Sequence, residues 1–390
     1  MSRRPPGVGR FVATILLLLL TQWLLVGAAL APVLPGGWAT LLLVVLLATP
    51  LPLALIMRQR VAGGYPGKWT RLLVVRPFWY LQLLLLLAGP VTAVGLLAGL
   101  LAGDASAGGR VALLLVVAVA AALGVLGYVG SRRLVVRRLE ARFPDLPPAL
   151  DGLRIVQLSD LHVGPHTSRR FLARVRRLAM EAEPALVAVT GDLIDDHGPD
   201  VEHYAAALGD LRAPLGVFAV AGNHDVYAGW PDVRARLERL PLTVLVNESR
   251  VVAWNGARLA VVGTGDPAGG RGGSATGGPD VARAFAALPP DAFVLALAHN
   301  PALWPAVARE RAALTLSGHT HWGQFALPSF GWSLASPFLQ HAMGSYEEDG
   351  RLLYIHPGTN YWGIPFRLGT PPEVAVVTLR RGERAEVVGV

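Results

Sequence analysis

Five short polar clusters in the second half of this 390-residue chain contain side chains that could bind metal ions. Aspartate, asparagine and histidine are ligands for divalent cations, and two such residues spaced by one can face the same centre. Each cluster alone is a common turn or a hydrogen-bonded core histidine, whereas five in one domain indicate a metal site. The clusters are Ser159-Asp160-Leu161-His162, Gly191-Asp192, Gly222-Asn223-His224-Asp225, His299-Asn300 and Gly318-His319-Thr320-His321.

Each cluster follows an apolar segment that is predicted to be a buried strand of an α/β fold with mixed sheets. These strands are predicted at residues 154–158, 185–189, 216–220, 293–298 and 314–316, and further strands at 243–254 and 258–262. Helical spacing predicts helices at 168–183, 200–211, 230–240 and 281–288. Because open α/β sheets bind ligands at the carboxyl ends of their strands, the five clusters are expected to converge on one site.

The composition divides the chain into two chemically different halves near residue 150. All ten histidines and 24 of the 27 acidic residues lie from Asp151 onward. The first 150 residues carry 14 Lys and Arg against three acidic residues, so the net charge of +8 belongs to this half and does not predict a nucleic-acid partner. The chain has no cysteine, which excludes disulfides and thiolate metal sites. No pattern predicts an oligomeric state.

The first half is predicted to be a membrane domain, residues 1–150, that ends in a basic linker to a catalytic domain, residues 151–390. Uncharged apolar runs, each long enough to cross about 30 Å of hydrocarbon, lie at about residues 11–34, 38–57, 77–102 and 111–130. A cleaved signal peptide is the alternative for the first run, but three more runs follow it. The interiors of the runs hold no acidic residue, no basic residue and no histidine, which favours an anchor over a transporter.

Basic residues are distributed unevenly around these four runs. The N-terminus, the second loop and the segment after the fourth run hold 13 of the 14 Lys and Arg of this half, and the other two loops hold only Arg110. Lys and Arg accumulate on the cytoplasmic side of membrane proteins. The pattern therefore predicts that both termini, and the catalytic domain with them, lie in the cytoplasm.

In their order, the five clusters resemble the calcineurin-like metallophosphoesterase superfamily over about residues 151–390. The first cluster and the tail Pro365-Phe366-Arg367-Leu368 with Pro372-Glu373 are similar to its membrane-associated bacterial branch, which includes the lipid A precursor pyrophosphatase type. The resemblance implies a four-layer αββα sandwich of two mixed sheets, here preceded by an all-α four-helix transmembrane domain. It also implies a location in the bacterial inner membrane.

The resemblance implies a two-metal site as well. Asp160, His162 and His321 would hold the first ion, Asn223, His299 and His319 the second, and Asp192 would bridge both. A hydroxide shared by the two ions would attack the phosphorus, while His224 faces the substrate phosphate and Asp225 orients His224. Ligands of nitrogen and oxygen without thiolate favour Mn²⁺ as the metal, with Fe, Zn²⁺ and Mg²⁺ as alternatives.

Four further residues are candidates for substrate binding. Arg169 and Arg170 begin an arginine-rich helix that could attract a lipid or nucleotide phosphate, or could simply be a solvated face. Arg367 lies in the family-like tail. Trp322 stands where this branch usually has glycine, which would bring an indole beside the site. The apolar segment 322–338 that follows is either a substrate-covering or membrane-dipping flap or a core hairpin.

These features together predict a membrane-anchored phosphohydrolase acting on a phosphodiester or pyrophosphate of a lipid-linked or nucleotide-lipid substrate. UDP-2,3-diacylglucosamine is the most concrete candidate by family resemblance, and membrane lipid is an expected partner. The first alternative is a phosphodiesterase of soluble or cyclic nucleotides that is only anchored at the membrane. The second is a non-catalytic metal-binding scaffold, which would be expected to have lost a ligand or His224, whereas all are present.

Overall fold

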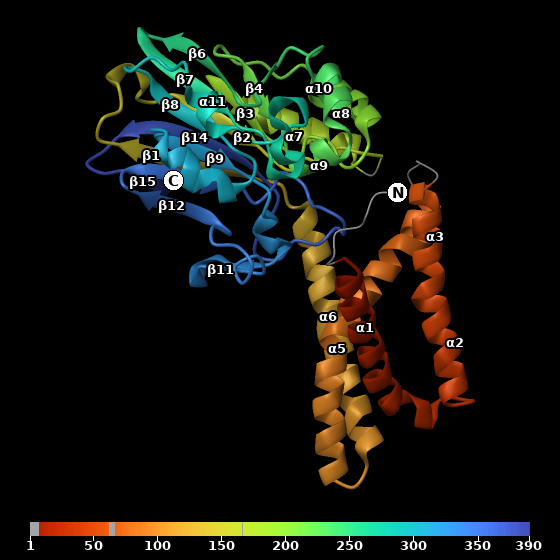
Figure 1. Ribbon diagram of the computed structural model, residues 1–390. Coiled ribbons are helices and arrows are strands. Elements are labelled where there is room, and N and C mark those ends of the chain that lie inside the picture. Colours follow the sequence, from red (N-terminus) through yellow and green to blue (C-terminus); the bar gives the residue numbers. More distant parts are fainter. Residues whose placement is uncertain (1–7, 62–66, 166) are drawn as a thin grey trace. The chain divides into compact units, whose positions relative to one another are not determined.

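The computed structural model describes residues 8–61, 67–165 and 167–390, which form two compact units that divide between Val125 and Leu126 (Figure 1). The first unit is helical. Its helices are α1 (Val8–Leu30), α2 (Trp38–Ala48), α3 (Pro50–Val61), the short α4 (Lys68–Thr70), α5 (Arg76–Leu101) and most of α6 (Ala105–Arg132). The last turns of α6 belong to the second unit.

Three segments of the described chain are long and apolar enough to cross a membrane. They are Trp38–Arg58, Arg71–Leu101 and Ala105–Arg132, and they contain the second, third and fourth predicted spans. The first predicted span coincides with α1, of which the described apolar part is Leu17–Val33. Candidate membrane helices are thus confirmed, while the count of four remains a prediction.

The second unit contains two mixed sheets, as predicted. The larger has the strand order β15 (Glu386–Gly389), β1 (Val135–Phe143), β14 (Glu373–Arg381), β2 (Arg154–Leu158), β3 (Leu186–Thr190), β4 (Val217–Val220) and β5 (Thr243–Val244). The smaller has the order β12 (Gly344–Glu348), β13 (Arg351–Ile355), β9 (Leu314–Ser317), β8 (Phe293–Leu297), β7 (Ala257–Gly263) and β6 (Glu248–Trp254). A separate hairpin pairs β10 (Ala326–Leu327) with β11 (Trp332–Ser333).

Helices connect the parallel strands in the central parts of both sheets. They are α7 (Arg169–Glu181), α8 (Val201–Leu208), α9 (Asn223–Tyr227) and α10 (Trp230–Leu237) in the larger sheet, and α11 (Val281–Phe285) and α12 (Trp304–Arg309) in the smaller. Such crossovers place helices on the faces of a sheet. The connections put the carboxyl ends of β2, β3 and β4 at one edge of the larger sheet.

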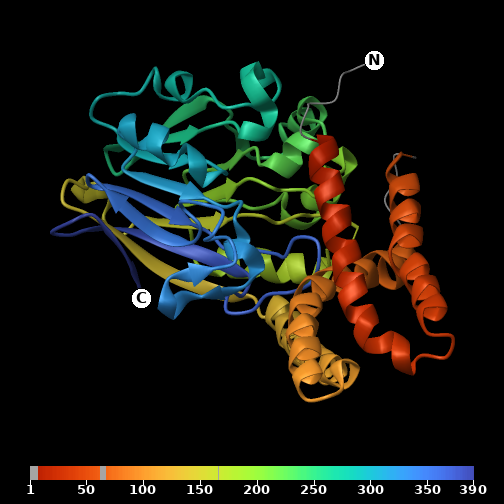
Figure 2. The ribbon, with the colours of Figure 1, turned by 60° about the horizontal axis from the view of Figure 1, so that its bottom comes forward.

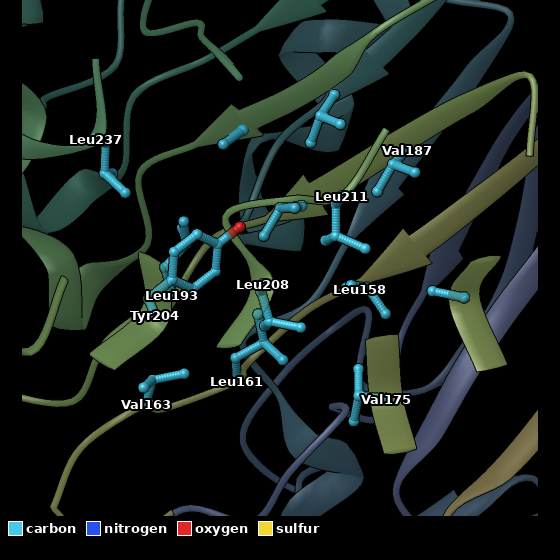
Figure 3. Close-up of a cluster of buried hydrophobic side chains, with 14 of the residues drawn as sticks. Leu158, Leu161, Val163, Val175, Val187, Leu193, Tyr204, Leu208, Leu211 and Leu237 are labelled. Carbon is cyan, nitrogen blue, oxygen red and sulfur yellow. The ribbon is translucent and has the colours of Figure 1, made fainter. Parts of the chain in front are cut away.

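Alternation along the strands produces the four layers. In β2, Ile155 faces the core between the two sheets, whereas Val156 belongs to the core beneath α7 and α8. In β7, Val261 and Val262 divide in the same way between the central core and the core beneath α11 and α12. Figure 3 shows the helical side of the larger sheet, where Tyr204 of α8 lies among buried leucines and valines. The predicted αββα class is confirmed.

The structure differs from the predicted boundary at residue 150. Residues 135–143, expected in a basic linker, form β1, which pairs in parallel with β14 and antiparallel with β15. The yellow strand β1 lies between blue C-terminal strands in both views (Figures 1 and 2). The strand has an alternating pattern, in which Leu139, Ala141 and Phe143 are buried and the residues between them face outward. Its many arginines made this pattern hard to recognise in the sequence.

An ion pair with a buried carboxylate provides a test of this placement. The Arg137 guanidinium donates to the Glu373 carboxylate at 2.6 Å, and the Glu373 side chain is fully buried. Arg137→Met leaves that carboxylate without its cation, so we expect a loss of roughly 2–3 kcal/mol of unfolding free energy. Thermal unfolding of the purified full chain measures this, with exposed Arg138→Met as the matched control. Equal stability of the two variants would contradict a structural role for β1.

Candidate metal centre

The predicted ligands lie in the loops directly after β2, β3, β4, β8 and β9, where the strands end. Five of them have a backbone in the left-handed region, which costs a non-glycine residue of order 1–3 kcal/mol. They are Asp160 (φ 51°), His162 (φ 41°), Asp192 (φ 50°), His319 (φ 70°) and His321 (φ 49°). Strain of this kind persists only where surrounding contacts impose it, and it concentrates at functional sites.

Backbone hydrogen bonds between the loops hold this conformation. The amide of Asp160 donates to the carbonyl of Gly191 at 3.1 Å, and the amide of His162 donates to the carbonyl of Asp192 at 3.0 Å. The His319 amide donates to the Asp160 carboxylate at 3.0 Å. Three loops that are distant in the sequence are thus joined directly at the site.

The first predicted ligand group is assembled. Asp160, His162 and His321 are buried, and their ligand atoms lie within 4.8 Å of one another. The two imidazole Nε2 atoms of His162 and His321 face each other at 3.0 Å, and His321 Nε2 lies 3.3 Å from Asp160 Oδ1. A carboxylate and two imidazoles that converge in this way are a suitable donor set for one divalent cation.

Asp192 lies between the two predicted groups. Its Oδ2 atom is 3.6 Å from His162 Nε2 on one side and 3.4 Å from His299 Nε2 on the other. On the second side, Asn223 Oδ1 lies 3.2 Å from His299 Nε2 and 2.8 Å from His319 Nδ1. The structure therefore brings all seven predicted ligands together, with Asp192 in the position of a bridge, and they fit two adjacent cations.

Residues 153–323 match the calcineurin-like phosphoesterase family. This part of the chain is therefore similar to calcineurin-like phosphoesterases. The match ends just after the last predicted ligand, so it covers all five polar clusters but neither the membrane helices nor the tail with Arg367.

Curated proteins that are similar to this chain include membrane proteins. A transmembrane protein with metallophosphoesterase domain from Bos taurus is 33% identical over 68% of this chain and 62% of its own length. The protein of the same description from Danio rerio is 29% identical over 69% of this chain and 62% of its own length. The chain thus spans about three fifths of these relatives.

Similarity extends to bacterial proteins and to a solved structure. An uncharacterized metallophosphoesterase, YkuE, from Bacillus subtilis is 29% identical over 60% of this chain and 82% of its own length. Among solved structures, the NAD nucleotidase NadN of Haemophilus influenzae is 16% identical, with a TM-score of 0.38, over 53% of this chain and 45% of its own.

Contacts on the far side of a predicted ligand from the metal centre orient its imidazole ring. His299 Nδ1 lies 2.7 Å from the carbonyl oxygen of Thr190, to which it donates, so the Nε2 lone pair is directed at the site. Gly191 has φ 88°, and a Cβ there would collide with the His299 ring. Glycine at this position therefore permits the close approach of the strand end to a ligand.

Charges around the ligands are strongly coupled. Burial of Asp192 by itself raises the pKa of its carboxyl group, but the neighbouring His299, His162 and His224 outweigh burial and the net pKa is lowered. Burial and the cation of Arg367 lower the pKa of His321 well below its usual value. Asp192 is therefore ionised and His321 neutral near pH 7, as metal ligands must be.

His224 lies at the edge of the metal centre, as predicted, and makes contacts that the sequence did not indicate. Its ring centroid is 4.7 Å from that of His162, and its Nδ1 is 2.8 Å from Asp196 Oδ1 and 3.6 Å from Asp195 Oδ1. Burial alone would lower the pKa of His224, but the hydrogen bond to Asp196 and the surrounding carboxylates raise it to about 9. His224 is thus a cation at neutral pH.

Asp225 does not orient His224, contrary to the prediction. Its buried carboxylate accepts hydrogen bonds from the backbone amides of Leu193 at 3.0 Å, Ile194 at 3.1 Å and Gly222 at 2.9 Å. These amides flank Asp192 and Asn223, so Asp225 holds the two loops that carry them. Burial and the charge of Asp192 raise the pKa of Asp225 to about 7. Asp196 holds the imidazole instead.

Two exposed aromatic side chains beside His224 were also missed. The ring centroids of Tyr227 and Trp362 each lie 5.7 Å from that of His224, and the side chains are 64% and 50% exposed. Tyr227 follows His224 by three residues in α9, which is the spacing of about one helical turn. This spacing is the feature of the sequence that could have indicated the contact. Trp362 comes from a distant loop, and its position could not be inferred from the local sequence.

Two predicted substrate-binding residues are buried and need correction. Arg367 is 1% exposed, and its guanidinium donates to the carbonyl oxygen of His321 at 3.0 Å and lies 2.8 Å from His321 Nδ1. Trp322 is 5% exposed, and its indole donates to the carbonyl of Ile355 at 2.9 Å. Neither faces a substrate, because both side chains are occupied beneath the site. Arg367 instead positions a ligand.

The remaining two candidates are exposed. Arg169 and Arg170 begin α7, whose buried face consists of Leu172, Val175 and Ala179. Both arginines are exposed to solvent. The structure does not join them to the ligands by any contact among the described residues, so their role in substrate binding remains a prediction.

Arg367 is expected to control metal affinity through His321. Arg367→Lys retains a positive charge but loses the planar fork that contacts both the ring and the carbonyl. Because partners behind a metal ligand typically contribute 10–100-fold in affinity, we expect about that loss for the variant. Isothermal titration of the chelated protein with Mn²⁺ measures it, and the exposed Arg258→Lys is the control. Unchanged affinity in Arg367→Lys would refute the positioning role.

Proposed function

We propose that this chain is a membrane-anchored, metal-dependent phosphohydrolase that acts on a lipid-linked or nucleotide-lipid phosphoester or pyrophosphate. The hydrolytic activity rests on one observation: the seven predicted ligands converge around Asp192, and a cationic imidazole lies beside them. When bound, two divalent cations would activate water and clamp the phosphoryl oxygens. Mn²⁺ is our first choice among Mn²⁺, Fe, Zn²⁺ and Mg²⁺ because the donors are imidazole, carboxylate and amide.

The residues of the chain have distinct tasks in this proposal. His224 donates a hydrogen bond, and then its Nε2 proton, to the oxygen that leaves phosphorus. Asp196 holds the other ring nitrogen and keeps the imidazole protonated. Asp192 offsets the repulsion between two close dications, and Asp225 fixes the loops that present Asp192 and Asn223.

A connection between the metal centre and a candidate membrane helix supports a lipid-linked substrate. Arg367, whose guanidinium contacts His321, donates its backbone N–H to the carbonyl of Gly127 in α6 at 2.8 Å. Gly127 belongs to the last turns of this apolar helix. A phosphate attached to a lipid is a substrate that a domain joined directly to such a helix could meet at the membrane surface.

The exposed aromatic pair favours a substrate that also carries a planar group. Tyr227 and Trp362 flank His224 and could stack against a nucleobase, an interaction worth about 1–3 kcal/mol per base. UDP-2,3-diacylglucosamine combines a base, a pyrophosphate and acyl chains and is therefore the first compound to test. The basic loops support an orientation with the domain in the cytoplasm, at the bacterial inner membrane.

Product analysis distinguishes the candidate substrates. The purified full chain, reconstituted in lipid nanodiscs with Mn²⁺, is incubated with the nucleotide lipid, a cyclic nucleotide or bis(4-nitrophenyl) phosphate. Turnover of the nucleotide lipid at much higher kcat/KM than of the soluble diesters is expected. Preference for a soluble diester would favour a phosphodiesterase that is only anchored. Failure to hydrolyse any phosphoester with any of the four metals would favour a non-catalytic scaffold.

A further inference from the structure

The segment that follows the last metal ligands exposes large apolar side chains. We call residues 326–338, which contain β10 and β11, the apolar hairpin. Phe330 and Phe338 are each 81% exposed, and Leu327 and Leu334 are 43% and 49% exposed. Leaving such side chains in water is unfavourable by about 25 cal/mol for each Å² of apolar surface. A cluster of this kind in one short segment indicates a surface that contacts an apolar partner.

The apolar hairpin is held in a defined conformation. β10 pairs with β11, and the amide of Leu334 donates to the carbonyl of Phe325 at 2.8 Å. The Ser333 amide donates to the Ser336 hydroxyl at 3.0 Å. The exposed phenyl rings are therefore presented by an ordered hairpin that does not need them for its own core.

Hydrogen bonds attach the base of the hairpin to the end of α6. The Ala326 amide donates to the carbonyl of Leu368 at 2.9 Å, and the Leu368 amide donates to the carbonyl of Gln324 at 3.0 Å. The preceding residue, Arg367, donates its amide to Gly127 of α6 at 2.8 Å. A Cβ at Gly127 would collide with the Phe366 ring, so the two segments are in direct contact.

This end of α6 has the features of a helix that leaves the hydrocarbon layer. Leu126 and Val129 are 56% and 60% exposed and apolar. One turn later, the Arg132 guanidinium contacts the Tyr128 hydroxyl at 2.7 Å and lies over its ring at 4.8 Å. Tyrosine and arginine at the end of an apolar helix are typical of the headgroup region. The Arg367 segment, and with it the base of the hairpin, lies at this level.

We propose that the apolar hairpin inserts into the headgroup and upper acyl region of the same membrane that α6 crosses, with Phe330 and Phe338 as the inserted side chains. The occupant of this apolar surface is a phospholipid bilayer. Insertion of aromatic side chains to a depth of about 5–10 Å is characteristic of interfacial membrane segments. The inference does not depend on hydrolytic activity or on the identity of the substrate.

The hairpin is also connected to the edge of the metal centre. The Gln324 side chain donates to the carbonyl of Trp362 at 3.1 Å and accepts from its amide at 2.9 Å. The Trp362 ring in turn packs against His224. Insertion of the hairpin would therefore bring the exposed Trp362 close to the lipid surface.

Absence of cysteine makes the depth of the hairpin directly measurable. Single-cysteine variants Phe330→Cys and Phe338→Cys are labelled with the environment-sensitive fluorophore NBD, in the full chain in nanodiscs of phosphatidylcholine and phosphatidylglycerol. Val129→Cys on α6 calibrates the lipid-exposed signal, and Val251→Cys on β6, which is 38% exposed, calibrates the aqueous signal. Acyl-brominated lipid and aqueous iodide are the two quenchers.

We expect the labels at positions 330 and 338 to show blue-shifted emission, a loss of emission with brominated lipid, and protection from iodide, as at position 129. Quenching by iodide but not by brominated lipid, as at position 251, would overturn the proposal. Two other results would also overturn it. A blue shift in NBD emission that orthovanadate causes, without quenching by brominated lipid, would indicate a flap over the site. A blue shift that requires two copies of the chain per nanodisc would indicate self-association.

Discussion

Asp192→Ala is expected to abolish hydrolysis and to remove most of the bound metal. Asp192 faces both ligand groups, at 3.6 Å from His162 and 3.4 Å from His299. Without it, two dications would repel each other across the site with no bridging anion. We expect a fall in kcat/KM of at least about a thousandfold, comparable to the loss of a principal electrostatic contact to a transition state.

Metal content and rate are measured together to interpret this variant. Inductively coupled plasma mass spectrometry of Asp192→Ala is expected to find less than one metal ion per chain. Asp291→Ala is the matched control, since Asp291 is exposed and pairs only with Arg258 among the contacts of the described residues. Retention of both metals and of hydrolysis in Asp192→Ala would refute the assignment of the bridge.

His224→Gln is expected to lower kcat while leaving the metal content unchanged. The His224 imidazole lies near His162 and Asp192 but forms no hydrogen bond to a predicted ligand among the described residues, and its backbone amide donates to Asp192 Oδ1 at 2.8 Å. A general acid typically increases the rate of the chemical step by about 10²–10⁴-fold, so the expected loss in kcat lies in that range. Loss of metal from this variant would show instead that His224 is part of the metal site.

The pH dependence gives a sharper test of the same residue. The pKa of His224 is raised to about 9, so its folded form is protonated and active at neutral pH, and kcat is expected to fall as the pH rises through the pKa. Bound cations offset the charge of Asp192, but Asp195 and Asp196 still favour the imidazolium. Asp196→Asn should therefore lower the pKa of His224 and shift the alkaline limb of the pH profile of kcat to lower pH. An unchanged limb would exclude His224 as the acid.

Local sequence patterns were sufficient for the central part of the catalytic fold. The strands β2, β3 and β4 and the helices between them have short apolar runs and helical spacing, and polar clusters mark their ends. Because parallel strands end at the same edge of a sheet, the order of these clusters led directly to a convergent site. The structure brings the seven ligands together in two groups around Asp192.

Features that depend on long-range packing could not be inferred in the same way. Arg367 and Trp322 were assigned to substrate by their position beside a motif, yet both are buried, since a side chain's direction depends on the tertiary contacts around it. Trp362 and Asp196 reach His224 from separate loops. The arginines of β1 favoured a solvated linker, although parallel pairing with a strand more than two hundred residues away determines its structure.

The connection between α6 and β1 limits how the catalytic unit can search for substrate. α6 ends at Arg132 and β1 begins at Val135, and the intervening Leu134 is buried in the core beneath the helices of the larger sheet. A domain on a long flexible linker can move far from its anchor, whereas only two residues separate this sheet from α6 in the sequence. Encounters with any membrane-bound molecule would then depend on lateral diffusion in two dimensions.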